Sequence, residues 1–424
     1  MNIETLRKKR PNRLSRSGLL LAILITLLTV DTAREEETNE PVRGPGQYRI
    51  LSEDRVIRFP FELFRGDIRF LGEINGREVR LLLDDGFMWD QLLFWGCPRV
   101  DSLGFVYDGE IMVGGGGNAD KVPSMTASDI TLKFPGVEFS GQSAVVTPYS
   151  SGMSRMWAGS EGQVSATFLK HFVVDINFDN MMITLIEPDR FEYKGKGVAL
   201  PLSPIGQGPS SIPAKLTLAD GRTVSVELML DLGYSNQLKI SPGLKNNITR
   251  PEKALPGSLG YGVQGETLGH NGRVPSVDIG GYTFSNVVAA FVSEDHPGDT
   301  YCEVMIGMGL LSRFNIVYDY PHQRIYLEPN HRFNDPFEYN MSGLSMRKGQ
   351  GDYLDVRRVH PNSPASDAGL KEGDRVTHIN GRMAIDYDIW ELIPLFRQEG
   401  RTVDLTVIRG DKQIDVSIIL RRLI

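Results

Sequence analysis

The sequence predicts a mainly β protein: two duplicated β lobes with a cleft between them, followed by a small α+β domain at the C-terminus. Three observations predict this fold class. Short β-rich runs alternate with turn dipeptides from Val56 onward. The lobe-length segments 56–188 and 198–330 contain the same features in the same order. The pattern changes after Pro329, where turn signals surround one amphipathic helical segment at about 386–398.

The composition is that of a globular, multi-domain chain. At roughly 150 residues per domain, the 424 residues correspond to about three domains. Hydrophobic residues make up 41% and charged residues 23% of the chain, which excludes wholesale disorder. The 46 basic and 53 acidic residues give a net charge of −7, and without residues 1–33 the balance is 40 − 51 = −11. We therefore expect no nucleic-acid partner.

The N-terminus has the pattern of an export signal or an N-terminal anchor. Six basic residues within residues 1–16 precede an uncharged apolar run from Gly18 to Val30. A helix of this length spans about 20 Å, less than the roughly 30 Å hydrocarbon core of a membrane, which favours removal as a signal peptide. The sequence Asp31-Thr32-Ala33 is a poor cleavage site, so membrane anchorage by residues 18–30 stays open. Positive-inside bias predicts an exported chain, periplasmic or anchored outside the cytoplasm.

The remaining domain boundaries follow from composition and from the repeat. Residues 34–49 are polar and contain Pro and Gly, as expected of a linker. The first lobe is placed at residues 50–190 and the second at residues 191–332. The C-terminal domain is placed at residues 338–424.

The repeat consists of four features in one order. Each lobe begins with a hairpin signal, Asn75-Gly76 in the first and Asp220-Gly221 in the second, followed by L-x-L-D-x-G. A glycine-rich segment follows Asp84 by 30 residues and Asp231 by 29 residues, and similar closing segments end each lobe. A pseudo-twofold axis between duplicated lobes would bring the two aspartates together as a carboxylate pair.

Residues 50–424 resemble bacterial exported aspartic proteases that have two retropepsin-like lobes and a PDZ domain. In that family each lobe contributes a D-[TS]-G loop with the catalytic aspartate, a glycine-rich flap, and a strand ending in Gly that supports the loop. The resemblance implies that Asp84 and Asp231 are catalytic. It implies support of the pair by Gly86, Gly233 and Gly307, and flap roles for Gly114, Gly115, Gly116, Gly117, Tyr261 and Gly262. Because turns and strand-like alternation follow it, Gly260–Gly265 is predicted to be a hairpin tip rather than a nucleotide loop.

The sequence departs from the family pattern after each aspartate. The Thr or Ser of the family bonds across to the opposite lobe, whereas Asp85 and Leu232 stand at these positions. Ser165 stands in the first lobe where Gly307 stands in the second. An inward Asp85 would raise the pKa of the pair, and an outward, solvated Asp85 is an equal alternative.

The predicted function is that of an exported aspartic endopeptidase acting on peptide or unfolded protein. Two carboxylates about 3 Å apart repel by roughly 5 kcal/mol at an effective dielectric constant near 20, so Asp84 and Asp231 would share one proton and activate water. The alternative is a non-catalytic peptide-binding or scaffold protein with degenerate lobes. A serine hydrolase is disfavoured because no G-x-S-x-G motif is present, although triads need not be contiguous in sequence.

No cofactor and no metal are expected. The seven histidines lack ligand-like spacing. Cys97 and Cys302 allow at most one disulfide, and free buried thiols are the alternative.

Residues 338–424 resemble an α+β PDZ domain. The segments 363–365, 368–370, 373–374 and 379–381 match the S-P-A, A-G-L, G-D and I-N-G parts of the family motif. The resemblance implies that the backbone of Gly343, Leu344, Ser345 and Met346 holds the carboxylate of a peptide or C-terminal tail, with Ser345 in place of a glycine. The domain would recruit or position a substrate, or gate the cleft.

Overall fold

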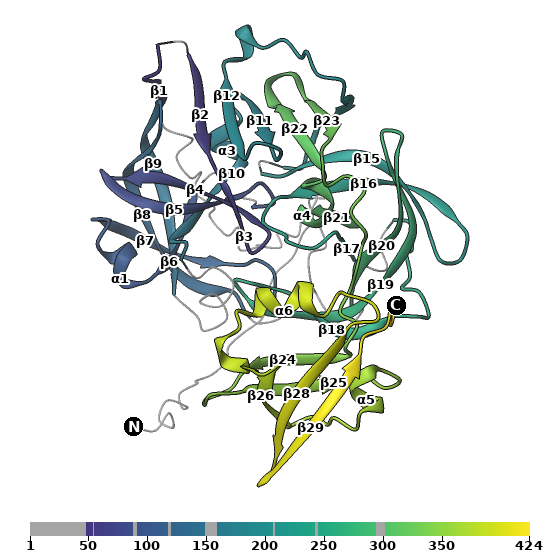
Figure 1. The fold of residues 1–424 in the computed structure, drawn as a ribbon. Coiled ribbons are helices and arrows are strands. Elements are labelled where there is room, and N and C mark those ends of the chain that lie inside the picture. Colours follow the sequence, from purple (N-terminus) through teal and green to yellow (C-terminus); the bar gives the residue numbers. More distant parts are fainter. Residues whose placement is uncertain are drawn as a thin grey trace, which may run out of the picture. The chain divides into compact units, whose positions relative to one another are not determined.

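A computed structural model describes residues 48–424 except 54, 88–90, 118–119, 149–158, 207, 242–244 and 294–301. The expected leader, residues 1–33, and most of the expected linker, residues 34–49, lie outside the described residues. Strands dominate the chain, so the prediction of a mainly β protein is confirmed (Figure 1). In the part of the chain that is described, every helix is too short or too polar to cross a membrane.

The first sheet has nine strands and is built by the segment 48–165. Its order is β1-β9-β6-β10-β5-β4-β8-β7, and β3 pairs with β4 at the side of this path. The predicted hairpin at Asn75-Gly76 joins β4 to β5, and both turn residues have the positive φ that such a turn requires. The strands are β1 (Tyr48–Ile50), β3 (Glu62–Phe64), β4 (Asp67–Ile74), β5 (Arg77–Asp84), β6 (Leu92–Gly96), β7 (Tyr107–Val113), β8 (Val122–Phe134), β9 (Val137–Pro148) and β10 (Gly162–Ser165).

The second sheet has eight strands and is built by the segment 203–307. Its order is β14-β15-β16-β21-β17-β20-β19-β18, and β15 also pairs with β19. The predicted hairpin at Asp220-Gly221 joins β15 to β16. The strands are β14 (Ser203–Pro204), β15 (Ser210–Thr217), β16 (Thr223–Asp231), β17 (Leu238–Ile240), β18 (Leu255–Gly262), β19 (Gly265–Ile279), β20 (Tyr282–Val292) and β21 (Val304–Gly307).

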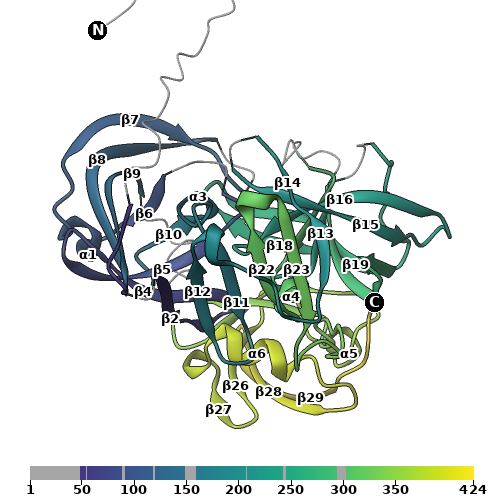
Figure 2. The ribbon, with the colours of Figure 1, turned by 90° about the horizontal axis from the view of Figure 1, so that it is seen from above.

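A third, six-stranded sheet combines strands from both halves of the chain in the order β13-β23-β22-β11-β12-β2. Its central pair is β11 with β22, which joins the two closing segments in antiparallel register (Figure 2). The strands are β2 (Val56–Pro60), β11 (Val173–Asn177), β12 (Met182–Ile186), β13 (Val198–Pro201), β22 (Phe314–Asp319) and β23 (Arg324–Pro329). Short helical turns accompany these sheets: α1 (Pro98–Asp101), α3 (Ala166–Leu169), η1 (Pro188–Arg190), α4 (Met308–Leu311) and η2 (Tyr320–His322).

One hydrophobic core extends through all three sheets. On β5, Leu81 and Leu83 point into it, and on β16 Leu228 and Leu230 do the same, because alternate residues of a strand share a face. Burying each leucine contributes about 1.5–3 kcal/mol, so the strands that end at the two aspartates are firmly anchored. Cys97 and Cys302 are half-buried and are not joined by a disulfide.

The C-terminal domain has a separate hydrophobic core. Its sheet runs β24-β25-β26-β28-β29, and β27 pairs with β26. The helix predicted at about 386–398 is shorter, because Asp388 caps its N-terminus in a capping box with Glu391 and helical geometry ends at Leu395. The elements are β24 (Leu344–Lys348), β25 (Leu354–Val359), α5 (Pro364–Asp367), β26 (Arg375–Ile379), β27 (Arg382–Met383), η3 (Ala384–Asp386), α6 (Ile389–Leu395), β28 (Thr402–Arg409) and β29 (Lys412–Ile419).

Candidate functional site

Two equivalent loops carry the predicted aspartates. Strand β5 ends at Asp84 and strand β16 ends at Asp231. In each loop the aspartate accepts a hydrogen bond from the backbone N–H two residues later: Gly86 N to Asp84 Oδ1 at 3.0 Å, and Gly233 N to Asp231 Oδ1 at 2.9 Å. This short-range bond orients each carboxyl group at the end of a rigid, buried strand.

The structure brings these four residues together. A Cβ atom added to Gly86 would lie 2.4 Å from Cγ of Asp231, and one added to Gly233 would lie 2.5 Å from Cγ of Asp84. Each glycine therefore packs against the carboxyl group of the opposite loop, where no larger residue fits. Asp84 and Asp231 keep part of their surface exposed, so a ligand can reach them.

Asp85 takes the inward of the two orientations that the sequence left open. Its side chain is 3% exposed. Its Oδ1 accepts a hydrogen bond of 2.6 Å from the N–H of Leu232, and its Oδ2 accepts one of 3.0 Å from the hydroxyl group of Tyr318. Asp85 thus links the two loops by accepting a backbone hydrogen, where the family pattern has a hydroxyl group.

Burial raises the pKa values of all three carboxyl groups, and neighbouring charges add to the shifts of Asp84 and Asp231. Burial, with the charge of Asp85, raises the pKa of Asp84 to about 7. Burial raises the pKa of Asp85 to about 6 even though its two hydrogen bonds oppose this shift. Burial and the charges of Asp84 and Asp85 raise the pKa of Asp231 well above its ordinary value. The cluster therefore holds protons at pH values where isolated carboxyl groups are ionised.

The sequence analysis missed three polar residues of this site. Gln163 on β10 donates from Nε2 to Asp84 Oδ2 at 2.6 Å, and β10 reaches this position because it runs parallel to β5. Asp67 is 4% exposed and accepts a hydrogen bond of 2.9 Å from the hydroxyl group of Ser235. Burial raises the pKa of Asp67 to about 7. The one signal in the sequence is the position of Ser235 four residues after Asp231.

Gly307 lies where the sequence analysis expected it. Strands β16 and β21 pair in parallel, with Gly307 opposite Asp231, and Ser165 stands opposite Asp84 in the pairing of β5 with β10. A Cβ atom on Gly307 would lie 2.2 Å from the carbonyl oxygen of Tyr234, so this position requires glycine. Ser165 shows that the position opposite Asp84 accepts a side chain.

The two predicted flap segments form hairpin tips that contact each other. Gly260–Gly265 lies at the turn between β18 and β19, which confirms a hairpin tip rather than a nucleotide loop. The N–H of Gly115 donates to Oε1 of Gln264 at 2.9 Å, and the N–H of Gln264 donates to the carbonyl oxygen of Gly116 at 3.1 Å. A Cβ atom on Gly262 would lie 2.1 Å from the Gly116 carbonyl oxygen, so the tips meet through backbone atoms. Tyr261 is exposed. A Cβ atom added to Gly114 would be in ordinary van der Waals contact with the side chain of Lys121.

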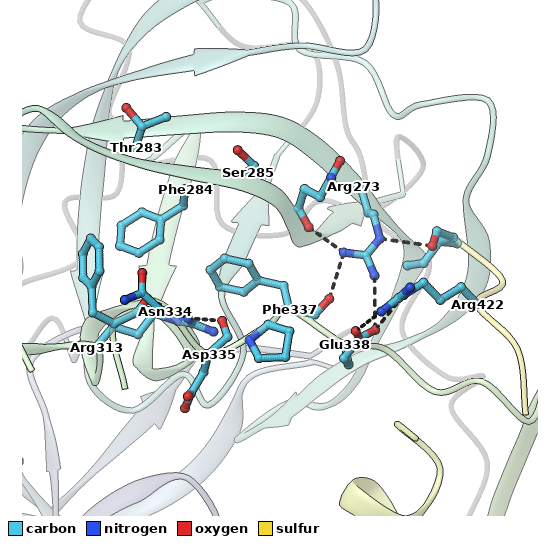
Figure 3. A pocket seen from close by; sticks show the side chains of 14 residues that line it. Arg273, Thr283, Phe284, Ser285, Arg313, Asn334, Asp335, Phe337, Glu338 and Arg422 are labelled. Atoms are coloured by element: carbon cyan, nitrogen blue, oxygen red, sulfur yellow. Dashed lines mark hydrogen bonds and ion pairs between the residues drawn. The ribbon is translucent and has the colours of Figure 1, made fainter. Parts of the chain in front are cut away.

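A cavity of about 610 Å³ lies elsewhere, where β19 and β20 meet the segment before the PDZ domain (Figure 3). Its arginines are already bound: Arg273 donates to the carbonyl oxygens of Ile424 at 3.1 Å and Phe337 at 2.9 Å, and Arg422 pairs with Glu338. These contacts attach the C-terminal segment to the second sheet. We interpret this cavity as structural, since its guanidinium groups are neutralised or saturated by the protein itself.

Residues 342–420 match the PDZ domain family, so the C-terminal domain is a PDZ domain. Gly343 in its loop has φ +78°, and Leu344, Ser345 and Met346 follow it into a groove beside α6. The chain is also 24% identical over 251 residues to a protein named putative serine protease HhoA from Synechocystis sp. (strain ATCC 27184 / PCC 6803 / Kazusa). This match covers 56% of the present chain and 58% of that protein, so the chain spans a little over half of its relative's length.

The relative contradicts the aspartic-type endopeptidase and the retropepsin-like assignment that we derived from the sequence, because it is named a serine protease. A protease with a PDZ domain is what the comparisons support. The error has a physical reason. G-x-S-x-G marks the nucleophile turn of one fold class only, whereas other serine proteases assemble their catalytic groups from distant segments. The absence of this motif therefore did not exclude serine chemistry.

Proposed function

We propose that this protein hydrolyses peptide bonds in unfolded protein segments, and that its PDZ domain binds another part of the same substrate. The observation that carries the proposal is the cluster of Asp84, Asp85 and Asp231 where two loops from different sheets meet. Clustering carboxyl groups costs stability, and groups with strongly shifted pKa values concentrate at functional sites. The PDZ domain and the relative named a serine protease support the protease class.

In this proposal Asp84 and Asp231 bind the substrate. A carboxyl group that keeps its proton near neutral pH can donate a hydrogen bond to a peptide carbonyl oxygen. The pKa of Asp84, about 7, and the raised pKa of Asp231 meet that condition. The hairpin tips at Gly114–Gly117 and Tyr261–Gly265 would separate to admit the peptide and then cover it, since glycine backbone permits close approach.

Ser235 is the serine to test first as the nucleophile. Its hydroxyl donates to Asp67 at 2.9 Å, and a serine becomes nucleophilic when an adjacent base accepts its proton. Because burial raises the pKa of Asp67 to about 7, this carboxylate can accept a proton near neutral pH. Ser235 follows the Asp231 loop, which places it beside the proposed peptide-binding carboxyl groups.

We also propose that the two lobes, at residues 50–190 and 191–332, are copies of one unit. Five strands of the first sheet match five strands of the second, both in their order along the chain and in their order across the sheet. Across the sheet these orders are β9-β6-β10-β5-β4 in the first and β20-β17-β21-β16-β15 in the second. The six-stranded sheet supports the same idea, because each half of the chain supplies three of its strands. The order β13-β23-β22 from the second half mirrors the order β11-β12-β2 from the first half.

Export remains part of the proposal, on the sequence of residues 1–30 alone. Fractionation of cells that express the full chain tests it. Protein found outside the cytoplasm, free or membrane-bound, supports export, and protein confined to the cytoplasm refutes it.

The activity is tested with the full chain and reduced, unfolded casein labelled with fluorescein, between about pH 4 and about pH 8. The variants are Asp84→Ala, Asp231→Ala and Ser235→Ala, because alanine removes the hydrogen-bond donor. Asp220→Asn is the control because its carboxylate is in an exposed turn. A fluorophosphonate probe, which labels activated serine hydroxyls, is added in parallel.

We expect cleavage by the wild type and by the control. Each of Asp84→Ala and Asp231→Ala should raise KM about tenfold, since each loses a hydrogen bond to the substrate. Ser235→Ala should lower kcat about 1,000-fold or more and abolish labelling. No cleavage by the wild type, or equal kinetics in wild type and both aspartate variants, overturns the proposal. Cleavage without labelling, or labelling at another serine, removes Ser235 alone.

A further inference from the structure

The turn between β3 and β4 has an unusual sequence for its backbone conformation. Arg65 and Gly66 are its two central residues, and their φ angles are +58° and +91°. A two-residue hairpin turn with positive φ at both positions favours Asn-Gly or Gly-Gly, and a long side chain is uncommon at the first of them. Contacts with the surrounding protein therefore hold Arg65 in this conformation.

The side chain of Arg65 contacts the PDZ domain. Its Nη2 atom donates a hydrogen bond of 2.7 Å to Oδ2 of Asp388, and the Arg65 side chain is 13% exposed. The other carboxylate oxygen of Asp388 accepts the N–H of Trp390 at 3.0 Å, as the N-cap of α6. One carboxylate thus fixes both the start of α6 and the guanidinium group of Arg65. Because this ion pair is also a hydrogen bond and is partly buried, it orients Arg65 better than a fully exposed pair would.

The two residues that follow Arg65 contact Ser235. A Cβ atom added to Gly66 would lie 3.2 Å from Cβ of Ser235, so the backbone of the turn packs directly against this serine. The next residue, Asp67, accepts the hydrogen bond of 2.9 Å from the Ser235 hydroxyl group. Three successive residues of one turn therefore connect the PDZ domain to the serine that we propose as the nucleophile.

Arg65 also acts on the charge of Asp67. Burial is the main cause that raises the pKa of Asp67 to about 7, and the charge of Asp84 acts in the same direction. The hydrogen bond from Ser235 and the charge of Arg65 act in the opposite direction. Only the ionised carboxylate can accept a proton, and a nearby positive charge stabilises that form. Arg65 therefore increases the fraction of Asp67 that is ionised near neutral pH.

We infer that Arg65 is a positioning residue for the pair of Asp67 and Ser235, and that Asp388 of the PDZ domain holds Arg65 in place. The inference rests on the proposed function, in which Asp67 accepts the proton of Ser235, and it adds two residues to that site. Arg65 keeps its own proton and acts through the charge of Asp67 and the backbone of the turn. The PDZ domain is thereby part of the structure that positions the proposed nucleophile, with or without a ligand of its own.

The first test measures how cleavage of unfolded, fluorescein-labelled casein by the full chain depends on pH, between about pH 5 and about pH 9. Arg65→Asn removes the charge and suits the turn, since Asn-Gly is a preferred pair there, so this variant should fold. It should move the midpoint of the acid limb upward by about 0.5 pH unit or more, which is about a threefold loss of rate on that limb. Arg65→Lys keeps the charge and should recover at least half of this shift. Arg77→Asn, at an exposed arginine beside another hairpin turn of the same sheet, is the control and should keep the wild-type midpoint.

The second test needs no activity. Asp388→Asn keeps an oxygen that can cap α6, but it replaces the acceptor of Arg65 by an NH₂ group. Hydrogen exchange measures the protection of residues 62–70 and 231–236, and thermal unfolding verifies that each variant folds. Both segments should exchange about threefold faster or more in Asp388→Asn than in the wild type. Asp386→Asn, at an exposed acid of the same segment, is the control and should exchange as the wild type does.

The two measurements separate the possible failures. An unmoved midpoint in Arg65→Asn overturns the action of Arg65 on Asp67. Unchanged exchange at residues 231–236 in Asp388→Asn overturns the contribution of the PDZ domain. If the wild type does not cleave casein, the proposed function fails, and the exchange measurement alone decides whether Arg65 and Asp388 position Ser235.

Discussion

The substitution Asp85→Asn tests the carboxyl cluster through stability. The amide keeps the shape of the side chain: its oxygen can accept the Leu232 N–H, and its NH₂ group can donate to the hydroxyl of Tyr318. What it removes is a carboxyl group whose pKa burial raises from 3.8 to about 6. Because the folded state binds this proton more tightly than the unfolded chain, its stabilising effect is full below about pH 3.8 and is lost as the pH rises through about 6.

The magnitude follows from this difference in pKa. About 6 minus 3.8, multiplied by 1.36 kcal/mol per unit, gives about 3 kcal/mol of stability lost by the wild type between these pH values. Asp85→Asn does not lose this stability, because its amide does not titrate in this pH range. It also lowers the pKa values of Asp84 and Asp231, because the charge of Asp85 is one of the causes that raise them. Both effects make the stability of Asp85→Asn less dependent on pH.

Urea unfolding at about pH 4 and about pH 7.5, followed by the fluorescence of the buried Trp95, measures this difference. The wild type should lose about 3 kcal/mol more than Asp85→Asn on going to the higher pH. Asp220→Asn, at an exposed turn, should behave as the wild type does. If Asp85→Asn and the wild type lose the same stability, Asp85 does not titrate as we infer and the reasoning fails.

Three further substitutions and one matched control test local parts of the fold. Gly86→Ala should cost about 3 kcal/mol or more in thermal unfolding, because the new methyl group meets the carboxyl group of the opposite loop. Gly115→Ala should change stability by about 0.5 kcal/mol or less, because its new methyl group would lie 3.6 Å from Cγ2 of Val263, an ordinary van der Waals contact. Arg409→Met should destabilise the PDZ domain by about 1–3 kcal/mol in urea unfolding. It removes the two hydrogen bonds, each 2.7 Å long, that Arg409 donates to Asp374, which is 1% exposed. An unchanged unfolding midpoint would show that the pair contributes nothing to stability. Asp388→Ala should cost about 1 kcal/mol by loss of the helix cap, and circular dichroism with urea unfolding would contradict the capping role if no change were seen.

The parts of the fold that depend on local chemistry could be predicted from the sequence. Asn75, Gly76 and Gly221 have the positive φ that Asn and Gly adopt readily in turns, so both hairpins could be predicted. The PDZ domain was predicted for the same reason, since its motif residues are turn and cap residues, such as Ser363, whose side chain accepts the Ser366 N–H. The α6 helix was predicted too long because hydrophobic periodicity shows neither that it begins after the N-cap Asp388 nor that it ends at Leu395.

Contacts between distant segments could not be predicted. Tyr318 binds Asp85 from 233 residues away, through a strand whose position depends on the pairing of β11 with β22. The orientation of Asp85 depends on that contact, so the sequence left it open. The pair of Asp67 and Ser235 joins two sheets in the same way. The predicted aspartic type was wrong because a D-x-G loop indicates a turn and a carboxyl group, but not which group would attack a substrate.

The carboxyl cluster links stability to ligand binding. Asp85 holds the two loops together, and its charge also raises the pKa values of Asp84 and Asp231. A ligand that accepts a hydrogen bond from a protonated member binds only the protonated form, so its binding must take up protons when the pH exceeds the pKa of that member. A peptide carbonyl therefore stabilises the form in which repulsion across the loops is smallest. By this reasoning, substrate binding and the stability of the contact between the loops should weaken together as the pH rises past about 7, the pKa of Asp84.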